Sequence, residues 1–252
     1  MKGSLTIVGL GPGAPELVTP AVTDALNDST DIVGYSKYID RVKDASSGKS
    51  FHPSDNREEI DRAELSINLA LQGKKVVVVS SGDPGVFAMA SAIFEVVDKK
   101  NISRDDLPIV VLPGITALLA ASARLGAPIG HDFCVINLSD NLKSWDILKS
   151  RVIAAAKADF VIAFYNPRSK SRKNQLSEIY DVLRKNCKSD RIVIYANSVS
   201  TESEAIFETT LSEADASSVS MKTLVIIGSS RTKKIRNTGY IYTPRYSGVE
   251  KN

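Results

Sequence analysis

The sequence has few of the residues that build disulfide frameworks or transition-metal sites. Its 252 residues include only two cysteines, Cys134 and Cys187, which form no Cys-x-x-Cys pair. A disulfide-stabilised extracellular domain is therefore excluded, and a reducing, cytoplasmic location is expected. The two histidines, His52 and His131, lie far apart in the sequence, so zinc would lack closely spaced ligands. We expect no bound metal.

The sequence also lacks a long apolar run. No stretch approaches the roughly 18 consecutive apolar residues that a membrane-spanning helix needs. The first residues, MKGSLTIVGLGPG, lead directly into an apolar run and a glycine turn, without the small-residue cleavage site of a signal peptide. We therefore expect no membrane association.

Charge of one sign and aromatic residues are scarce as well. The formal net charge is +3, and aromatic residues make up 6% of the chain. An RNA-binding module would need a stronger basic excess and aromatic residues interleaved with it, so nucleic acid is not an expected partner. A small anionic substrate is compatible with this charge.

The sequence does contain short apolar runs that end in Gly, Pro or polar residues. Their β-branched composition is typical of strands that are buried on both faces of a parallel sheet. Helical segments lie between them, and this alternation predicts an α/β architecture. The expected strands are 4–10, 74–81, 108–112, 133–140, 159–165, 191–197 and 222–228, and the expected helices are 57–72, 87–98, 115–125, 144–157 and 171–187.

The order of these segments predicts two α/β domains with largely parallel sheets. A helix that ends near Gly126 and Pro128 precedes a second series of strands. We expect an N-terminal domain of residues 1–113, a C-terminal domain of residues 114–246, and a tail of residues 247–252.

Three glycine-rich turns follow three of the expected strands. The first, Gly9-Leu10-Gly11-Pro12-Gly13, is similar to a dinucleotide fingerprint, but Pro12 and Pro15 remove amide groups that a phosphate would need. A nicotinamide-dependent oxidoreductase is therefore disfavoured. No Gly-Lys-Ser/Thr follows, which excludes a Walker A loop. A simpler interpretation is a tight turn into a helix capped near Thr19.

The other two turns each allow a functional and a structural interpretation. In the second, Ser80 to Phe87, the Asp83 carboxylate could accept hydrogen bonds from a ribose or an amine, or it could cap a helix that starts near Val86. In the third, Pro113 to Ala117, the Thr116 hydroxyl could face a ligand or cap a helix. In an open parallel sheet, ligands bind at the carboxyl ends of strands, which is where these turns lie.

The turns, in this order and spacing, resemble those of the tetrapyrrole methyltransferases, the class III S-adenosylmethionine methyltransferases. The resemblance covers residues 4 to about 246, and some segments are similar to members that contract the macrocycle while methylating it. The segments that carry it are GLGPGAPELVTPAV at 9–22, SGDPGVFAMAS at 81–91, PGITALLAASARLGAPIGHDFCVINLSD at 113–140, YNPRSKSR at 165–172, MKTLVIIGSS at 221–230 and YTPR at 242–245.

The resemblance implies a homodimeric enzyme of two α/β domains with an active-site cleft between them. It implies S-adenosylmethionine as the methyl donor and an anionic tetrapyrrole on the route to cobalamin as the substrate. It places Tyr35 toward the substrate. The residues that it places at the cofactor are Pro12, Ser81, Gly82, Asp83, Val86, Thr116, Ala117, Tyr165, Asn166 and Thr209.

The ring contraction that this resemblance implies converts a hydroxyl to a ketone and would benefit from a positioned base. His131 and Asp132 are the candidates because they are adjacent ionisable groups, although His131 could instead hold the loop before a strand. The carboxylates of the substrate need cations, which arginine binds bidentately. Arg168 is the preferred residue, and a second basic cluster spans Arg231 to Arg236; both could equally be solvated surface.

The sequence departs from the family pattern in the segment Asn197 to Glu202. Ring-contracting relatives commonly carry Gly-Arg after the asparagine, whereas this chain has Ser198 and Val199. No arginine in this loop can therefore be given a role. The resemblance leaves both a metal-free and a cobalt-containing tetrapyrrole open, and the segment TDIVGYSKYIDRV at 30–42 favours the metal-free one.

Overall fold

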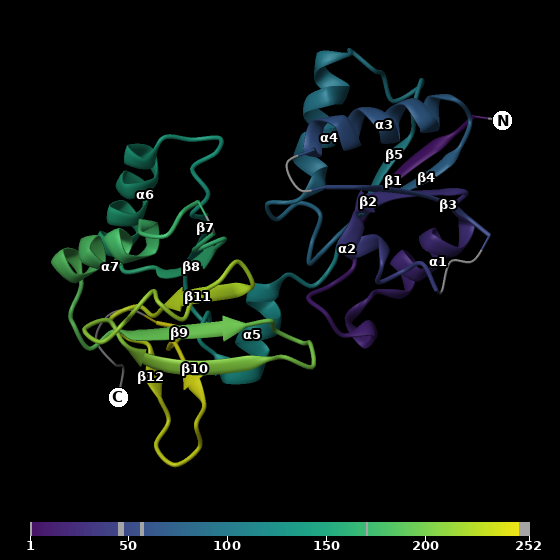
Figure 1. Cartoon of the computed structure of the whole chain (residues 1–252). Helices are drawn as coiled ribbons and strands as arrows, with labels where there is room; N and C mark the ends of the chain where they lie inside the picture. Colours follow the sequence, from purple (N-terminus) through teal and green to yellow (C-terminus); the bar gives the residue numbers. More distant parts are fainter. Residues whose placement is uncertain (1, 45–47, 56–57, 170, 247–252) are drawn as a thin grey trace. The chain divides into compact units, whose positions relative to one another are not determined.

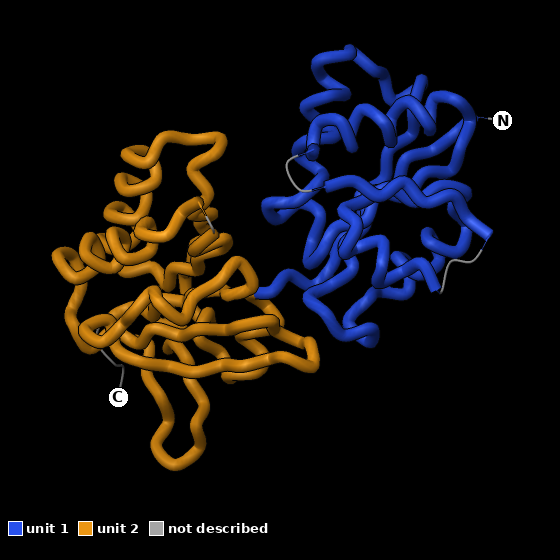
Figure 2. The backbone as a smooth tube through the Cα atoms, viewed as in Figure 1, with its two compact units in different colours: residues 1–117 blue, residues 118–252 orange. Residues whose placement is uncertain are grey.

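A computed structural model of the chain describes residues 2–44, 48–55, 58–169 and 171–246. The chain divides into two compact units, unit 1 (Met1–Ala117) and unit 2 (Leu118–Asn252), coloured separately in Figure 2. The sequence predicts a domain boundary between residues 113 and 114, which is four residues before the observed division between the two units. The expected tail, 247–252, lies outside the described residues.

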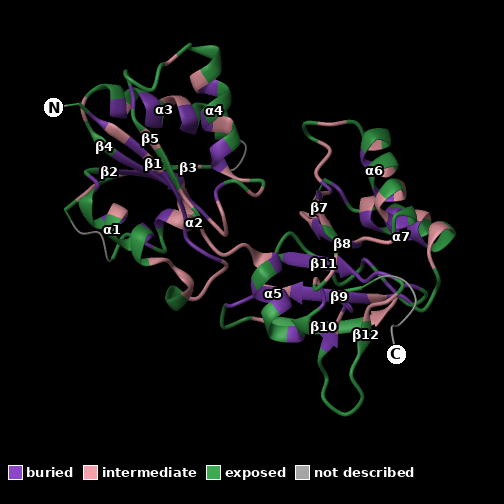
Figure 3. Ribbon diagram, turned by 180° about the vertical axis from the view of Figure 1, so that it is seen from behind, coloured by how far each residue is buried: buried purple, intermediate pink, exposed green. Residues whose placement is uncertain are grey.

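Unit 1 is built on a five-stranded sheet in which every neighbouring pair is parallel (Figure 1). The strand order is β3-β2-β4-β1-β5, so β4 and β5 flank β1. The three central strands are largely buried on both faces (Figure 3), which explains the four consecutive valines of β4. The strands are β1 (Ser4–Gly9), β2 (Asp31–Tyr35), β3 (Ser50–Ser54), β4 (Lys75–Ser80) and β5 (Ile109–Leu112).

Helices cover both faces of this sheet, because alternate residues of each strand point to opposite sides. Ile7 and Val78 pack with α3 (Glu59–Leu71) and α4 (Met89–Lys99). Val8 and Val79 pack with α1 (Pro20–Asp28) and the short α2 (Ser36–Ile39) on the other face. As expected, Thr19 caps α1, and its side chain accepts a hydrogen bond from the Val22 amide at 3.4 Å.

Unit 2 contains a mixed five-stranded sheet of order β10-β9-β11-β8-β7. Here β7 and β8 are parallel, whereas β11 is antiparallel to β8 and to β9, and β10 is antiparallel to β9. The expected parallel pairing therefore holds throughout the first sheet and for one pair of the second. The strands are β7 (Phe133–Asn137), β8 (Val161–Tyr165), β9 (Ile192–Asn197), β10 (Ala205–Thr210) and β11 (Thr223–Ile227).

The helices α6 (Trp145–Lys157) and α7 (Gln175–Asn186) lie on one face of this sheet and share a core with Phe164 and Val225 (Figure 1). Helix α5 (Ala117–Leu125) opens the unit. A small sheet joins β6 (Gly126–Ala127), β13 (Ile241–Tyr242) and β12 (Lys233–Lys234).

All seven expected strands and all five expected helices are confirmed, within four residues at their ends. Apolar runs do not predict β2, β3 and β10, because these short strands contain polar residues or proline and lack a long apolar run. They do not predict the two-residue strands β6, β12 and β13 either. No helix in the described part of the chain is both long and apolar enough to cross a membrane.

Candidate functional site

The three glycine turns meet because β4, β1 and β5 are adjacent parallel strands and end at the same edge. The first two turns are joined by a pair of backbone hydrogen bonds. The Gly82 amide donates to the Gly11 carbonyl at 2.8 Å, and the Gly11 amide donates to the Gly82 carbonyl at 3.2 Å. The turns therefore form one backbone surface at the carboxyl edge of the unit 1 sheet.

Glycine is required where the turns cross. A Cβ on Gly9 would lie 2.4 Å from the Gly82 carbonyl oxygen, and a Cβ on Gly114 would lie 2.2 Å from the same oxygen. No side chain fits at such distances, so the backbones touch directly. Gly82 itself has φ of +60°, which glycine adopts without strain.

Asp83 connects the second turn to the third. Its Oδ1 accepts a hydrogen bond from the Gly85 amide at 2.8 Å, and its Oδ2 accepts one from the Gly114 amide at 3.0 Å. The interpretation of Asp83 as a helix cap was wrong, because α4 begins at Met89 and its N-cap is Ala88. Each carboxylate oxygen accepts a backbone hydrogen bond, and a ligand would have to share their remaining lone pairs.

Arg41 lies in the segment that follows α2, and its side chain bonds to the backbone of the first glycine turn. Its guanidinium donates to the carbonyl oxygens of Leu10 at 2.6 Å, Gly11 at 3.3 Å and Gly13 at 3.2 Å. Burial lowers the pKa of Arg41. Sequence patterns do not identify this residue, since nothing in the sequence relates Arg41 to a turn about 30 residues earlier.

Two tyrosines lie where β2, the neighbour of β4, ends and α2 follows. Tyr35 is the last residue of that strand, and its ring meets Tyr38 edge-on at 5.3 Å. Burial, together with the nearby Tyr35, raises the pKa of Tyr38, which also hydrogen-bonds Ser81. The structure thus brings Tyr35, expected at the substrate, to the same edge as Ser81, expected at the cofactor. Tyr38 was missed.

The remaining unit 1 residues expected at the cofactor also belong to these turns. Pro12 lies in the first turn and is half-buried. The amide of Val86 donates to the Asp83 carbonyl at 3.2 Å, which closes the second turn. Thr116 lies beside Gly82, since a Cβ there would be 3.5 Å from the Thr116 Cα. Ala117 begins α5.

The carboxyl edge of the unit 2 sheet carries two more of the expected cofactor residues, Tyr165 and Asn166. The Tyr165 hydroxyl, at the end of β8, accepts a hydrogen bond from the Leu118 amide at 2.9 Å, in the first turn of α5. Asn166 has φ of +51°, and its Nδ2 donates to Asn137 Oδ1 at 3.1 Å. Asn137, at the end of β7, was not singled out in the sequence.

The loop after β9 continues this edge and departs from the family pattern. Ser198 and Ser200 have φ of +47° and +60°, in the left-handed region that glycine prefers. The Ser200 amide donates to Glu204 at 2.6 Å, and Glu204 also pairs with Arg124 at 3.3 Å. Strained backbone of this kind concentrates at functional sites.

The structure does not bring Thr209 to this edge. Thr209 pairs with Val193 at the start of β9, and through β11 that level of the sheet corresponds to Ile162. Tyr165 is therefore separated from Thr209 by three residues along the strand direction, roughly 10 Å, and by three strand spacings across the sheet, roughly 14 Å.

His131 and Asp132 also lie away from Tyr165 and Asn166. They precede β7, whereas Asn137 ends it, so Asp132 is about 16 Å along the strand from Asn137. His131 Nδ1 is 3.5 Å from Asp132 Oδ2, and the Asp132 carboxylate is exposed. The pair expected to assist ring contraction thus occupies the opposite edge of the unit 2 sheet.

Arg168 supports the backbone of unit 2. Its Nη1 donates to the carbonyl oxygens of Ala216 and Ser217, both at 2.7 Å. One nitrogen of the guanidinium is therefore already engaged, and a substrate carboxylate would have to use the others.

The chemistry of the unit 1 edge suits a small cationic ligand held by backbone groups. Its surface consists of glycine turns, hydroxyls and the Asp83 carboxylate, and the Arg41 guanidinium is turned toward carbonyl oxygens. A sulfonium with adenosine attached could be held by such amides and carbonyls. Within the described residues, no group of three or more His, Cys, Asp or Glu side chains could hold a metal ion.

Comparison with known sequences identifies relatives along nearly the whole chain. The family model for tetrapyrrole (corrin/porphyrin) methylases matches residues 4–215. A precorrin-3B C(17)-methyltransferase from Sinorhizobium sp is 44% identical over 98% of both chains. A probable cobalt-factor III C(17)-methyltransferase from Salmonella typhimurium is 37% identical, over 96% of this chain and 98% of the relative.

Solved structures give the same result. The crystal structure of the methyltransferase CobJ superposes with a TM-score of 0.91 at 48% identity, over 96% of this chain and 100% of that one. A uroporphyrin-III C-methyltransferase from Thermus thermophilus, complexed with S-adenosylhomocysteine, superposes with a TM-score of 0.69 at 20% identity, over 90% of this chain and 97% of that one, and shows the shared fold.

Proposed function

Because the chain belongs to the tetrapyrrole (corrin/porphyrin) methylases, we propose that it methylates carbon 17 of precorrin-3B and contracts the ring to give precorrin-4 in cobalamin biosynthesis. The methyl donor in this proposal is S-adenosylmethionine. The observation that carries the proposal is the match over 98% of both chains with a relative of that name.

The unit 1 edge fits the task of holding the donor. When bound, S-adenosylmethionine supplies an activated methyl group whose leaving group is a neutral thioether, so no acid is required to expel it. The turns around Pro12, Ser81 to Val86 and Thr116 to Ala117 would bind and orient the donor through backbone groups. Alignment and exclusion of water can contribute several kcal/mol to such a displacement. In this proposal Tyr165 and Asn166 also contact the donor.

The base for ring contraction is a separate part of the proposal. His131 and Asp132 were chosen from the sequence, and their position at the opposite edge of the unit 2 sheet gives this assignment no geometric support. A His131→Gln variant tests it directly. Methyl transfer without ring contraction would support a catalytic role, whereas an unchanged yield of contracted product would remove His131 from the mechanism.

A cobalt-containing substrate is the second candidate. The 37%-identical relative is named for cobalt-factor III, and the chain covers 98% of it. The higher identity of the precorrin-3B enzyme favours the metal-free substrate. With cobalt-factor III in place of precorrin-3B as the substrate, the chemistry of methyl transfer would be unchanged.

We propose in addition that the protein is a cytoplasmic homodimer. The edge strand β5 supports self-association, because Val110 and Val111 are 50% and 39% exposed there. Exposed apolar side chains on an unpaired strand edge are a common feature of interfaces. Light scattering of the purified protein would give the mass that decides between monomer and dimer.

An anaerobic incubation tests the function. The protein would receive methyl-labelled S-adenosylmethionine with either precorrin-3B or cobalt-factor III, and the mass and absorbance of the products would be recorded. Label in a contracted ring from precorrin-3B is the expected result. Label from cobalt-factor III alone would select the second candidate, and transfer to neither would contradict both.

A further inference from the structure

A polar pocket lies in unit 2, at the sheet edge opposite to Tyr165 and Asn166. Its volume is about 120 Å³. A single water needs only about 10–15 Å³ of such space, so the pocket can admit a group of several atoms. Its lining comes from segments before β7 and β8 and after β11: His131, Asp132, Ala158, Asp159, Ser229, Arg231, Thr243 and Pro244.

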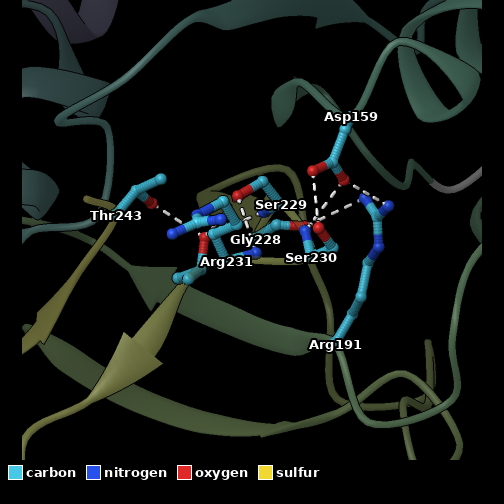
Figure 4. Close-up of polar contacts among 8 residues, drawn as sticks. Asp159, Arg191, Gly228, Ser229, Ser230, Arg231 and Thr243 are labelled. Atoms are coloured by element: carbon cyan, nitrogen blue, oxygen red, sulfur yellow. Dashed lines mark hydrogen bonds and ion pairs between the residues drawn. The ribbon is translucent and has the colours of Figure 1, made fainter. Parts of the chain in front are cut away.

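One wall of the pocket is fixed around Asp159. This residue has φ of +60°, and its carboxylate accepts hydrogen bonds from Arg191 at 2.6 Å and from the Ser230 amide and hydroxyl at 2.8 and 2.6 Å (Figure 4). Arg191 is 7% exposed and also reaches the Gly228 carbonyl at 3.3 Å. The charge of Asp159 is therefore compensated inside the protein.

The opposite wall is fixed by hydroxyl groups. Thr243 donates to the Pro128 carbonyl at 2.5 Å and lies 2.8 Å from the Thr232 hydroxyl. Thr232 accepts a hydrogen bond from the Ser229 amide at 2.8 Å, and the Ser229 hydroxyl accepts one from the Arg231 amide at 3.2 Å. These bonds hold the backbone of residues 229–232 in place.

The Nε atoms of Arg231 and Arg191 are both buried, and among the described residues neither has a hydrogen-bond partner. Arg191 bonds to Asp159 and Gly228 through its terminal nitrogens, whereas the Arg231 side chain lines the pocket. The guanidinium carbon lies 5.3 Å from the centroid of the Tyr246 ring. Stacking on a ring uses the face of a guanidinium and leaves the N–H groups in its plane for an acceptor.

We propose that this pocket binds a small oxyanion of the carboxylate or phosphate type, which accepts hydrogen bonds from the two terminal nitrogens of Arg231. Bidentate pairing of this kind matches the geometry of arginine. A cation is a poor fit, because the Asp159 oxygens already accept three hydrogen bonds and the Asp132 carboxylate is 77% exposed. The oxyanion could be a free small anion or a carboxylate arm of a larger acid.

Titration of the full chain with inorganic phosphate and with acetate, at constant ionic strength, tests the site. Calorimetry would give the affinity, and nitrogen-15 spectra would follow Arg231 Nε and the Ser230 amide. We expect saturable binding with shifts at both groups. An absence of saturation with either probe would overturn the proposal without any variant.

Variants then assign the binding to Arg231. Arg231→Gln should weaken the affinity about tenfold or more, and Arg231→Lys should weaken it less because the charge remains. Asp132→Asn should strengthen it by removing a like charge. The control is Arg151→Gln, which removes an exposed cation from α6 of the same unit. Equal affinity of Arg231→Gln and the wild-type protein would overturn the proposal.

Kinetics distinguish the two sources of the oxyanion. If the pocket takes an arm of the tetrapyrrole, Arg231→Gln raises the KM for that substrate and leaves the KM for the methyl donor unchanged, and phosphate competes with the substrate. If it takes a free anion, both KM values stay unchanged, and phosphate binds equally well to the substrate complex. The proposed methyl transfer can fail independently, since the titrations need no activity.

Discussion

Asp83 and Gly114 are joined by a hydrogen bond of 3.0 Å between the carboxylate Oδ2 and the backbone amide. This bond ties the turn after β4 to the turn after β5, two strands that are separated in the sheet by β1. Asp83 therefore organises the proposed cofactor site, whether or not it also touches the donor.

Replacing Asp83 with Asn should disrupt this link. An Asn side chain has one acceptor oxygen, so either the Gly85 or the Gly114 amide loses its partner. An unsatisfied amide costs about 1–3 kcal/mol, so the affinity for S-adenosylhomocysteine, measured by calorimetry, should fall roughly 5- to 150-fold. The exposed Asp105→Asn in the same unit is the control, and equal affinities for both variants would contradict this role of Asp83.

Gly114→Ala and Gly82→Ala should differ in stability. The new Cβ at position 114 would lie 2.2 Å from a carbonyl oxygen, whereas at position 82 it would be in ordinary contact at 3.5 Å. Gly82→Ala should therefore cost only the strain of a left-handed residue, about 1–2 kcal/mol, and Gly114→Ala more than that. Urea unfolding measures both free energies, and a smaller loss for Gly114→Ala would show that the turns do not touch as described.

Arg41 should act as a positioning residue for the first glycine turn. Arg41→Met removes three hydrogen bonds to the carbonyls of Leu10, Gly11 and Gly13. We expect the KM for S-adenosylmethionine to rise about tenfold with a smaller change in kcat, and Arg41→Lys to restore part of the loss. The exposed Arg104→Met is the control. A loss confined to kcat, without rescue by lysine, would argue against positioning.

Asp31 should make stability depend on pH. Burial alone would raise its pKa, but hydrogen bonds with His52 and Thr30 outweigh this and hold the pKa of Asp31 below its ordinary value. A carboxyl with a lowered pKa in the fold stabilises the protein above about pH 3.9, and this stability is lost as the pH falls through the lower folded value.

Asp31→Asn should therefore reduce the free energy of unfolding at pH 7, and the difference from the wild-type protein should narrow in strong acid. Urea unfolding across this pH range provides the measurement, with the exposed Asp24→Asn as the control. A difference that stays constant with pH would show that the Asp31 charge is not the cause.

Ser198→Gly should be tolerated or slightly stabilising. Ser198 has φ of +47°, a conformation that costs a non-glycine residue about 1–2 kcal/mol, whereas glycine adds about 0.5–1 kcal/mol of entropy to the unfolded chain. The net gain in the free energy of unfolding should be about 1 kcal/mol or less. A clear loss would mean that the Ser198 side chain stabilises the loop.

The sequence by itself determined the strand-helix alternation and the family. Runs such as KKVVVVSS are buried strands because only such strands can bury β-branched residues on both faces. Close backbone contact at Gly9 and Gly114 leaves no room for any side chain, so these positions require glycine. The turns can therefore be recognised in the sequence by their glycines.

Only the tertiary structure decided which side chains meet. Arg41 reaches a turn 30 residues away, and His131 and Arg231 line one pocket although 100 residues separate them. Conversely, His131 lies at the far end of β7 from Asn137, although both belong to the same short motif. A local pattern reports backbone preference and burial, whereas strand order and direction set long-range contacts, and these depend on how the whole sheet pairs.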